Sequence, residues 1–157
     1  MIIVGYQGIG KSTAAGSKHN CIDLESGNFW HNGIRPDNWY VFYCQIANHL
    51  SEQGYTVFVS SHEVVRNRLR KYSKEQIYII CPSVELKEEW IYKLKKRFES
   101  TKLEKDYKAW MNAEDRYVEN INELKNSGIK CIEISDMDYD LLEIIQYLKD
   151  YGELKND

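Results

Sequence analysis

The first residues of the chain place glycine, lysine and hydroxyl side chains at a spacing that can bind phosphate. Residues 5–12 read GYQGIGKS and fit the pattern G-x-x-x-x-G-K-[ST] at every fixed position. Glycines allow a backbone path whose N–H groups converge on an anion. Lys11 would then reach the outer phosphates of a nucleotide, and Ser12 would bind Mg²⁺.

The context of this loop favours phosphate binding over a glycine-rich turn with a surface lysine. The apolar residues 1–4 predict the strand from which such a loop must leave. The sequence therefore predicts a site for a nucleoside triphosphate, expected to be ATP with Mg²⁺. Its expected binding residues are Gly5, Gly8, Ile9, Gly10, Lys11, Ser12 and Thr13.

Two carboxylates follow the second apolar run, where residues 21–26 read CIDLES. Ligands of an open α/β sheet bind at the carboxyl ends of the strands, so Asp23 and Glu25 are expected at the same crevice as the loop. Asp23 is expected to bind Mg²⁺ together with Ser12. The third apolar run ends in Ser60, Ser61 and His62, without the aspartate that usually holds the metal. Two surface acids at a strand end are the alternative interpretation.

Transfer of a phosphoryl group also needs cationic side chains, because negative charge spreads over the transferred group. The candidates are Arg35, Arg66, Arg68, Arg70, Lys95, Lys96, Arg97 and Arg116. On a helix Arg66 and Arg70 share a face, whereas Arg68 points away. Residues 26–40 hold Phe29, Trp30 and Arg35, which can stack on a flat ring and pair with a phosphate. For each arginine, the alternative interpretation is a solvated charge on the surface.

Five apolar runs alternate with helical patterns, at residues 1–4, 21–24, 56–59, 77–81 and 129–134. This order predicts an α/β fold with a five-stranded parallel sheet flanked by helices. A short helix is predicted to begin at Lys11, and a further helix is predicted to follow a cap at Ser83 and to run to Phe98. Other helices are predicted at 39–50, 62–71 and 141–148. A polar tail begins at Gly152. Residues 102–126 predict a long amphipathic helix or a broken pair.

Length and composition narrow the class of protein. The 157 residues are expected to form one domain, and the net charge of −3 with a pI near 5.8 makes nucleic acid an unexpected partner. No apolar stretch approaches the ~20 residues of a membrane span and no signal peptide is visible, so a cytoplasmic protein without a membrane partner is expected. The four cysteines are expected to be buried free thiols.

These motifs together resemble a known family. The order of phosphate loop, D-x-[DE], small polar residues and a basic lid helix resembles shikimate, gluconate and nucleoside monophosphate kinases. The strings GYQGIGKST, IDLES-x-x-FW, VFVSSHE-x-VR and PS-x-ELKEEW are similar to short adenylate-kinase-like proteins of Gram-positive bacteria and their phages. The resemblance implies a P-loop NTPase fold over residues 1–157, an acceptor-binding insert at about 26–40 and a mobile lid at about 82–116.

The resemblance also implies roles for single residues. Lys11, Asp23, Arg97 and Arg116 would be catalytic, whereas Glu25, Phe29, Trp30, Arg35, Ser61 and Arg66 would bind the acceptor. Asp23 would contact a Mg²⁺-bound water or orient the attacking hydroxyl. Glu25 departs from the aspartate found in shikimate kinases and has a longer reach.

The expected function is Mg²⁺-dependent transfer of the ATP γ-phosphate to a small acceptor, with a nucleoside monophosphate as the first candidate. The alternatives are a kinase for a non-nucleotide hydroxyl compound and a nucleotide-binding regulatory protein with little turnover. The sequence leaves open the acceptor, the choice of ATP over GTP and the oligomeric state.

Overall fold

The structure, a computed structural model, describes residues 1–17 and 19–152 of the chain. These residues form a five-stranded sheet in the order β2-β3-β1-β4-β5, and every pair of neighbouring strands is parallel. The strands are β1 (Ile2–Gly5), β2 (Cys21–Asp23), β3 (Thr56–Val59), β4 (Ile77–Pro82) and β5 (Cys131–Ile134). The expected α/β class with a five-stranded parallel sheet is confirmed. The predicted strands at 1–4, 21–24, 77–81 and 129–134 differ from the observed bounds by one or two residues, and the strand at 56–59 agrees.

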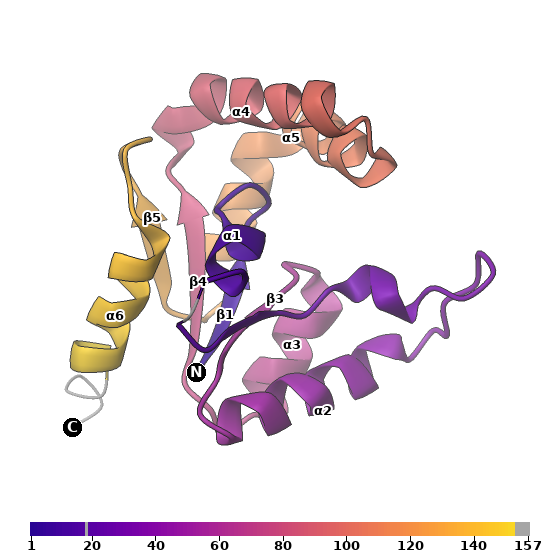
Figure 1. Cartoon of the computed structure of the whole chain (residues 1–157), viewed down its shortest axis with the longest axis vertical. Coiled ribbons are helices and arrows are strands. Elements are labelled where there is room, and N and C mark those ends of the chain that lie inside the picture. Colours follow the sequence, from indigo (N-terminus) through magenta and orange to yellow (C-terminus); the bar gives the residue numbers. More distant parts are fainter. Residues whose placement is uncertain (18, 153–157) are drawn as a thin grey trace.

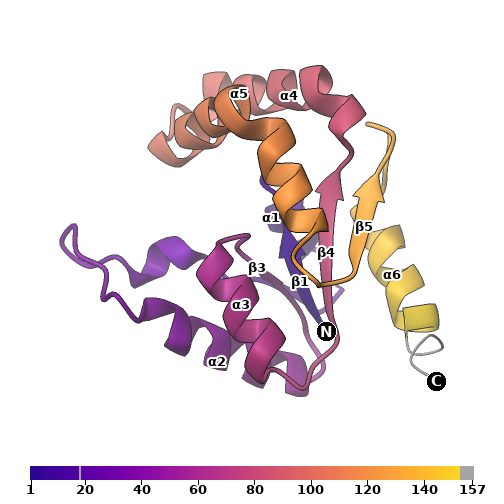
Figure 2. The same cartoon turned by 180° about the vertical axis from the view of Figure 1, so that it is seen from behind.

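Helices cover both faces of the sheet (Figures 1 and 2). Helices α1 (Lys11–Ala15) and α6 (Leu141–Tyr151) lie on one face, whereas α3 (Glu63–Tyr72) and the second half of α5 (Glu104–Lys125) lie on the other. Helix α2 (Trp39–Glu52) packs against α3 and β3. Two 3₁₀ turns, η1 (Ser26–Phe29) and η2 (Val84–Leu86), precede α2 and α4.

Helix α4 (Lys87–Thr101) and the first half of α5 lie beyond the carboxyl ends of the strands (Figure 1). They are joined by a sharp turn in which Lys102 has a φ of 56°. Helix α5 is one helix with a kink at Arg116, where φ is −138°. The predicted cap Ser83 precedes η2 and makes no capping bond through its side chain, so α4 begins four residues later than this signal.

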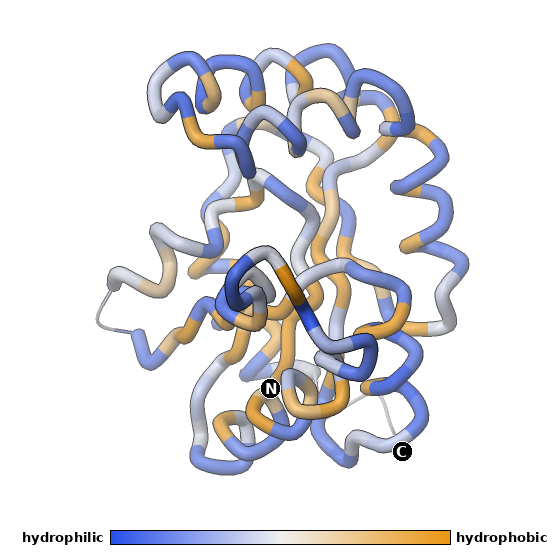
Figure 3. The backbone as a smooth tube through the Cα atoms, turned by 90° about the vertical axis from the view of Figure 1, so that its right-hand side faces the viewer, coloured by the Kyte–Doolittle hydropathy of each residue, from blue (hydrophilic) through white to orange (hydrophobic). Residues whose placement is uncertain are grey.

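The core follows from the position of β1 between β3 and β4. Ile3 pairs with Phe58 on one side and with Tyr78 on the other, and the whole of β1 is buried. Such continuous burial is typical of a parallel sheet covered on both faces. Figure 3 shows apolar colours along the central strands and mainly hydrophilic colours along the helices at the top. The loop that follows β1 therefore emerges at the centre of the sheet.

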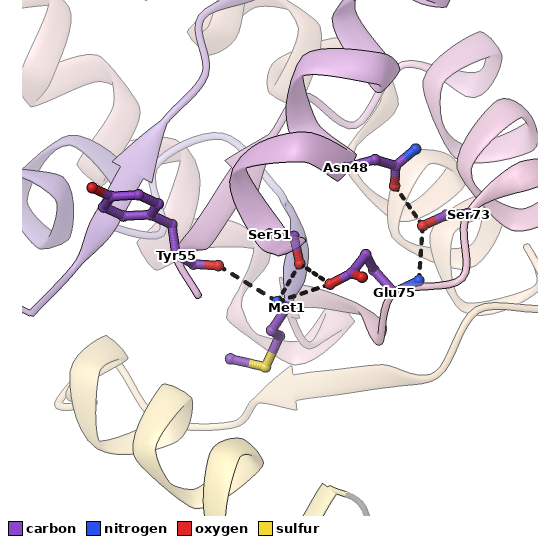
Figure 4. A network of polar contacts seen from close by, with 6 residues as sticks. All are labelled: Met1, Asn48, Ser51, Tyr55, Ser73 and Glu75. Atoms are coloured by element: carbon purple, nitrogen blue, oxygen red, sulfur yellow. Dashed lines mark hydrogen bonds and ion pairs between the residues drawn. The ribbon is translucent and has the colours of Figure 1, made fainter. Parts of the chain in front are cut away.

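A polar network lies at the amino ends of the strands, opposite the loop (Figure 4). The Met1 amino group donates to the Ser51 hydroxyl at 2.5 Å and lies 3.8 Å from the Glu75 carboxylate. Ser51 also donates to Glu75, and Ser73 donates to the Asn48 side chain at 2.6 Å. The network joins the beginning of β1 to α2 and to the segment before β4.

The four cysteines are free, as expected, and all except the half-buried Cys131 are buried. The sulfur atoms of Cys81 and Cys131 lie 3.3 Å apart on neighbouring strands. The predicted polar tail begins at Gly152, which the structure places, buried, at the end of α6; residues 153–157 lie outside the described residues. Among the described helices, none has both the length and the apolar composition that a membrane span requires.

Candidate active site

The loop at residues 5–12 turns sharply between β1 and α1, and two of its glycines are required by the backbone. Gly8 has a φ of 88° and Gly10 a φ of 103°. These angles lie in the left-handed region, which strains residues that carry a Cβ atom. The glycine spacing of the motif thus matches the positions at which the chain turns.

Lys11 folds back over this loop. Its Nζ lies 3.4 Å from the Gly5 carbonyl oxygen, and the side chain is half-buried. Burial lowers the pKa of Lys11, against the opposing influence of Asp23 and Glu25. The ammonium group is thus partly desolvated, and an anion beside it would restore the lost solvation.

Ser12 in the first turn of α1 meets Asp23 at the end of β2. The Ser12 hydroxyl donates to Oδ2 of Asp23 at 3.1 Å, so two hard oxygen donors lie side by side. Among the residues that the structure describes, no group of three His, Cys, Asp or Glu side chains could hold a metal by itself. Mg²⁺ keeps several waters and binds through one or two protein ligands plus phosphate oxygens, so this pair fits it.

A cavity of about 230 Å³ lies over the loop and is called the loop cavity here. Three cationic side chains, Lys11, Arg97 and Lys105, line it together with the carboxylates Asp23, Glu25 and Asp106. Helix α4 supplies Arg97, and the beginning of α5 supplies Lys105 and Asp106. The loop cavity therefore brings together the expected Lys11, Asp23, Glu25 and Arg97.

Arg97 is held by a buried partner that the sequence did not suggest. Its Nε lies 3.0 Å from Oδ1 of Asp106, whose side chain is 5% exposed. The other oxygen of Asp106 accepts from the Thr101 hydroxyl at 2.5 Å. Because Nε is used in this pair, the two terminal nitrogens of the guanidinium stay available to a ligand.

A second cavity of about 670 Å³, the large cavity, adjoins the loop cavity. The two share the lining residues Gln7, Glu25, Lys105 and Ala109. The large cavity is also lined by the expected Trp30, Arg35, Ser61 and Arg66. A ligand in one cavity can therefore contact a ligand in the other.

The segment from Ser26 to the start of α2 forms one wall of the large cavity and extends away from the sheet (Figure 1). The Arg35 guanidinium lies 4.8 Å from the ring centre of Trp30 and 4.0 Å from that of Trp39. Phe29 does not line the cavity. It packs instead against the buried rings of Trp39 and Tyr43 at 6.0 and 5.6 Å, because its 3₁₀ turn directs it toward α2.

Arg66 lies in the opposite wall and is 5% exposed. Its guanidinium donates to the Ser61 carbonyl at 3.0 Å and pairs with Glu123 of α5. Arg70, one helical turn later, donates to the Ser127 carbonyl at 3.0 Å. The two share a face, as expected, whereas Arg68 lies 4.3 Å from the Tyr72 ring.

The structure does not bring Arg116 to these cavities. It is exposed and pairs with Glu119 on the same helix at 3.0 Å. Its neighbour Tyr117 is 1% exposed and points into the core, and adjacent helical residues face different directions. Lys105, Asp106 and Glu123 line the cavities in its place, and no motif in the sequence marks them; Gln7, at a variable position of the loop motif, lines both cavities as well.

A third cavity of about 430 Å³, the outer cavity, borders the loop on its other side. It shares Gly10 and Thr13 with the loop cavity and is otherwise lined by Ile9, Ala14, Lys93 of α4, the segment before α6 and the first two residues of α6. The loop cavity thus shares lining residues with both larger cavities, which share none with each other.

Comparison of the sequence with protein-family models and with curated proteins finds no match. The interpretation of the site therefore depends on its residues and geometry.

Proposed function

We propose that the chain is a Mg²⁺-dependent kinase of the P-loop NTPase class that transfers the γ-phosphate of ATP to a small acceptor. The observation that carries this proposal is the adjacency of the outer, loop and large cavities, which share lining residues in series. This adjacency fits a nucleoside in the outer cavity, a polyphosphate in the loop cavity and an acceptor in the large cavity. The strand order, with the loop after the central β1, is compatible with a nucleoside monophosphate kinase-like fold.

The loop cavity suits the triphosphate. Lys11 and Arg97 would neutralise the charge that spreads over the transferred group. Mg²⁺ held by Ser12 and Asp23 would neutralise further charge on the phosphate oxygens when bound. Asp23 would in addition contact a metal-bound water or orient the attacking hydroxyl.

The large cavity suits an anionic acceptor with a flat ring. Trp30 offers a ring face, and Arg35 and Lys105 offer positive charge at opposite sides. Ser61 and Glu25 can bind hydroxyl groups of the acceptor. A nucleoside monophosphate has all of these features, so it is the first candidate. In the structure Lys105 lies 4.0 Å from the Glu25 carboxylate, and Arg35 lies over the Trp30 and Trp39 rings. A phosphate-free hydroxyl compound would add no anionic partner to either cation.

A nucleotide-binding regulatory protein with little turnover is the second candidate. No carboxylate stands at the tip of β3, where Ser60, Ser61 and His62 follow the strand. In this candidate the large cavity would have no chemical role, although it shares Glu25 and Lys105 with the loop cavity. That sharing favours the kinase.

A screen of acceptors with Mg²⁺-ATP, read by product mass, tests the proposal. We expect one acceptor class to gain 80 Da, and Lys11→Ala to lose both transfer and most ATP affinity while it stays folded. Lys96→Ala is the matched control, because Lys96 pairs with Glu99 on the exposed side of α4. Tight ATP binding without transfer to any acceptor would favour the regulatory candidate. Equal ATP affinity of Lys11→Ala and wild type would overturn both.

Two further variants separate the roles of the carboxylates. Asp23→Asn should lower kcat with little change in ATP affinity, as expected for an interaction made mainly in the transition state. Glu25→Gln should chiefly raise the KM of the acceptor. Unchanged kinetics in both variants would remove the two acids from the active site.

A further inference from the structure

Two aromatic side chains from distant parts of the chain bind the outer side of the loop at 5–12. The Trp90 indole N–H of α4 donates to the Gln7 carbonyl oxygen at 2.9 Å. The Tyr139 hydroxyl, just before α6, donates to the Ile9 carbonyl oxygen at 2.8 Å. The two rings are stacked, with centres 6.0 Å apart and planes at 22°.

These bonds determine where the next N–H groups point. Every peptide bond of the described residues is trans, so a carbonyl and the N–H that follows it point in opposite directions. When the Gln7 and Ile9 carbonyls face the aromatic pair, the N–H groups of Gly8 and Gly10 face away from it. Gly8 and Gly10 both line the loop cavity. Within the described backbone, no carbonyl accepts from either of these N–H groups.

A third side chain strengthens the arrangement. Lys93 donates from Nζ to the Tyr139 hydroxyl oxygen at 3.0 Å and lies 4.4 Å from the Trp90 ring centre. A hydroxyl that accepts from an ammonium group is a stronger donor to its own acceptor. Burial raises the pKa of Tyr139 to about 12, so the hydroxyl keeps its proton at neutral pH. Trp90 is fully buried, and its N–H would lack a partner without Gln7.

We propose that Trp90 and Tyr139 are positioning residues that hold the Gly8 and Gly10 N–H groups in place to bind the polyphosphate of the nucleotide. The inference rests on the proposed function for the identity of the ligand. Neither side chain lines the loop cavity itself, so both act through the backbone. A loop whose donors are already oriented loses less conformational entropy when the anion binds.

The test uses isosteric variants and a probe that needs no turnover. Trp90→Phe and Tyr139→Phe remove the donor and keep a ring, and calorimetry measures the affinity for inorganic tripolyphosphate with Mg²⁺. We expect each variant to bind about tenfold more weakly than wild type, equivalent to ~1.4 kcal/mol. Tyr117→Phe is the matched control, because it removes a buried hydroxyl that donates to the Ser83 carbonyl at 2.7 Å and not to the loop, and it keeps the ring that packs against Tyr6.

The outcomes separate this inference from the proposed function. Wild-type affinity in both variants, or an equal loss in Tyr117→Phe, would overturn the inference and leave the kinase proposal intact. A wild-type protein that binds neither tripolyphosphate nor ATP would overturn both.

A measurement on the wild-type protein tests the inference even if the variants fail to fold. Saturating tripolyphosphate should move the amide proton signals of Gly8 and Gly10 downfield in NMR spectra, because both would donate to phosphate oxygens. Unmoved signals at both glycines would contradict the inference, whatever the variants do.

Discussion

Arg97 and Asp106 form an ion pair across the turn between α4 and α5, with 3.0 Å between Nε and Oδ1. The carboxylate is buried, whereas the guanidinium is 42% exposed beside the loop cavity. A buried carboxylate needs compensation for its lost solvation, and Arg97 and Thr101 provide it. The pair therefore fixes the direction in which Arg97 can reach a ligand.

Asp106→Asn should weaken the interaction with Arg97, although the amide keeps an oxygen that can accept from the guanidinium. Under the kinase proposal we expect kcat to fall about tenfold, with a small change in the KM of ATP. Glu99→Gln is the matched control, since its partner Lys96 lies away from the cavities. If Asp106→Asn lowers kcat equally in wild type and in an Arg97→Ala background, the carboxylate does not act through Arg97.

Tyr43 joins the segments that follow β2 and β3, which lead into the two walls of the large cavity. Its hydroxyl donates to the Leu24 carbonyl at 2.6 Å and accepts from the Ser60 N–H at 2.8 Å. Tyr43→Phe should leave the carbonyl of half-buried Leu24 and the N–H of half-buried Ser60 without this partner and cost about 2 kcal/mol, which lowers Tm by about 4–8 °C. The KM of the acceptor should rise more than the KM of ATP.

Tyr147→Phe, at an exposed position of α6, serves as the control for thermal unfolding and kinetics. A Tyr43→Phe protein with the Tm of wild type would show that the two bonds contribute nothing to stability.

His62 gives the folded protein a pH dependence. Partial burial of its ring, with the nearby cations Arg35 and Lys11, holds the pKa of His62 below its ordinary value of 6.5. The unfolded chain therefore binds a proton more readily, and stability falls as the pH drops from above 6.5 through the lowered pKa. The neutral ring bonds to the Ser60 hydroxyl at 2.7 Å.

Urea unfolding at pH 7.5 and 5.5 checks this expectation. His62→Gln should lose less stability between the two pH values than wild type does. His49→Gln, on the exposed side of α2, should behave like wild type. The assignment to His62 fails if both variants follow the wild-type pH dependence.

The expected lid at 82–116 contains a part that is anchored. Trp90 and Leu94 are 0% and 1% exposed, and Trp90 is bonded to the loop. Closure over a bound triphosphate would therefore be limited to residues after 94. With an ATP analogue and an acceptor together, hydrogen exchange should slow at 95–116 and stay unchanged at 84–94. An equal change over 82–116 would show that the whole segment moves.

The sequence predicts the positions of the strands and helices well, because each has a clear apolar period and a clear boundary residue. It also singles out Lys11, Asp23 and Arg97, which the structure brings to one cavity, and their catalytic roles stay predictions. Periodicity says which side of a helix is buried. It does not say that the N–H of a buried Trp90 meets Gln7, 83 residues away.

The missed residues share a physical cause. Lys105 and Asp106 reach the loop cavity only because the turn at Lys102 folds α5 back against α4. By residue type alone, Phe29 is as good a candidate as Trp30, and Arg116 is as good a candidate as Arg97. The direction of each side chain decides which of them reaches a cavity. That direction depends on the 3₁₀ turn and on the helical neighbour Tyr117, which a motif does not encode.

Trp30 and Trp90 lie in surroundings so different that their fluorescence can report on two separate places in the molecule. Trp30 is 53% exposed at the rim of the large cavity, whereas Trp90 is fully buried behind the loop. Indole emission changes with solvent contact, so an acceptor that covers Trp30 would alter the emission of that residue. In Trp30→Phe this signal disappears, and any remaining response to a triphosphate comes from the other indoles. Intrinsic fluorescence can thus follow the filling of the two cavities without an added label.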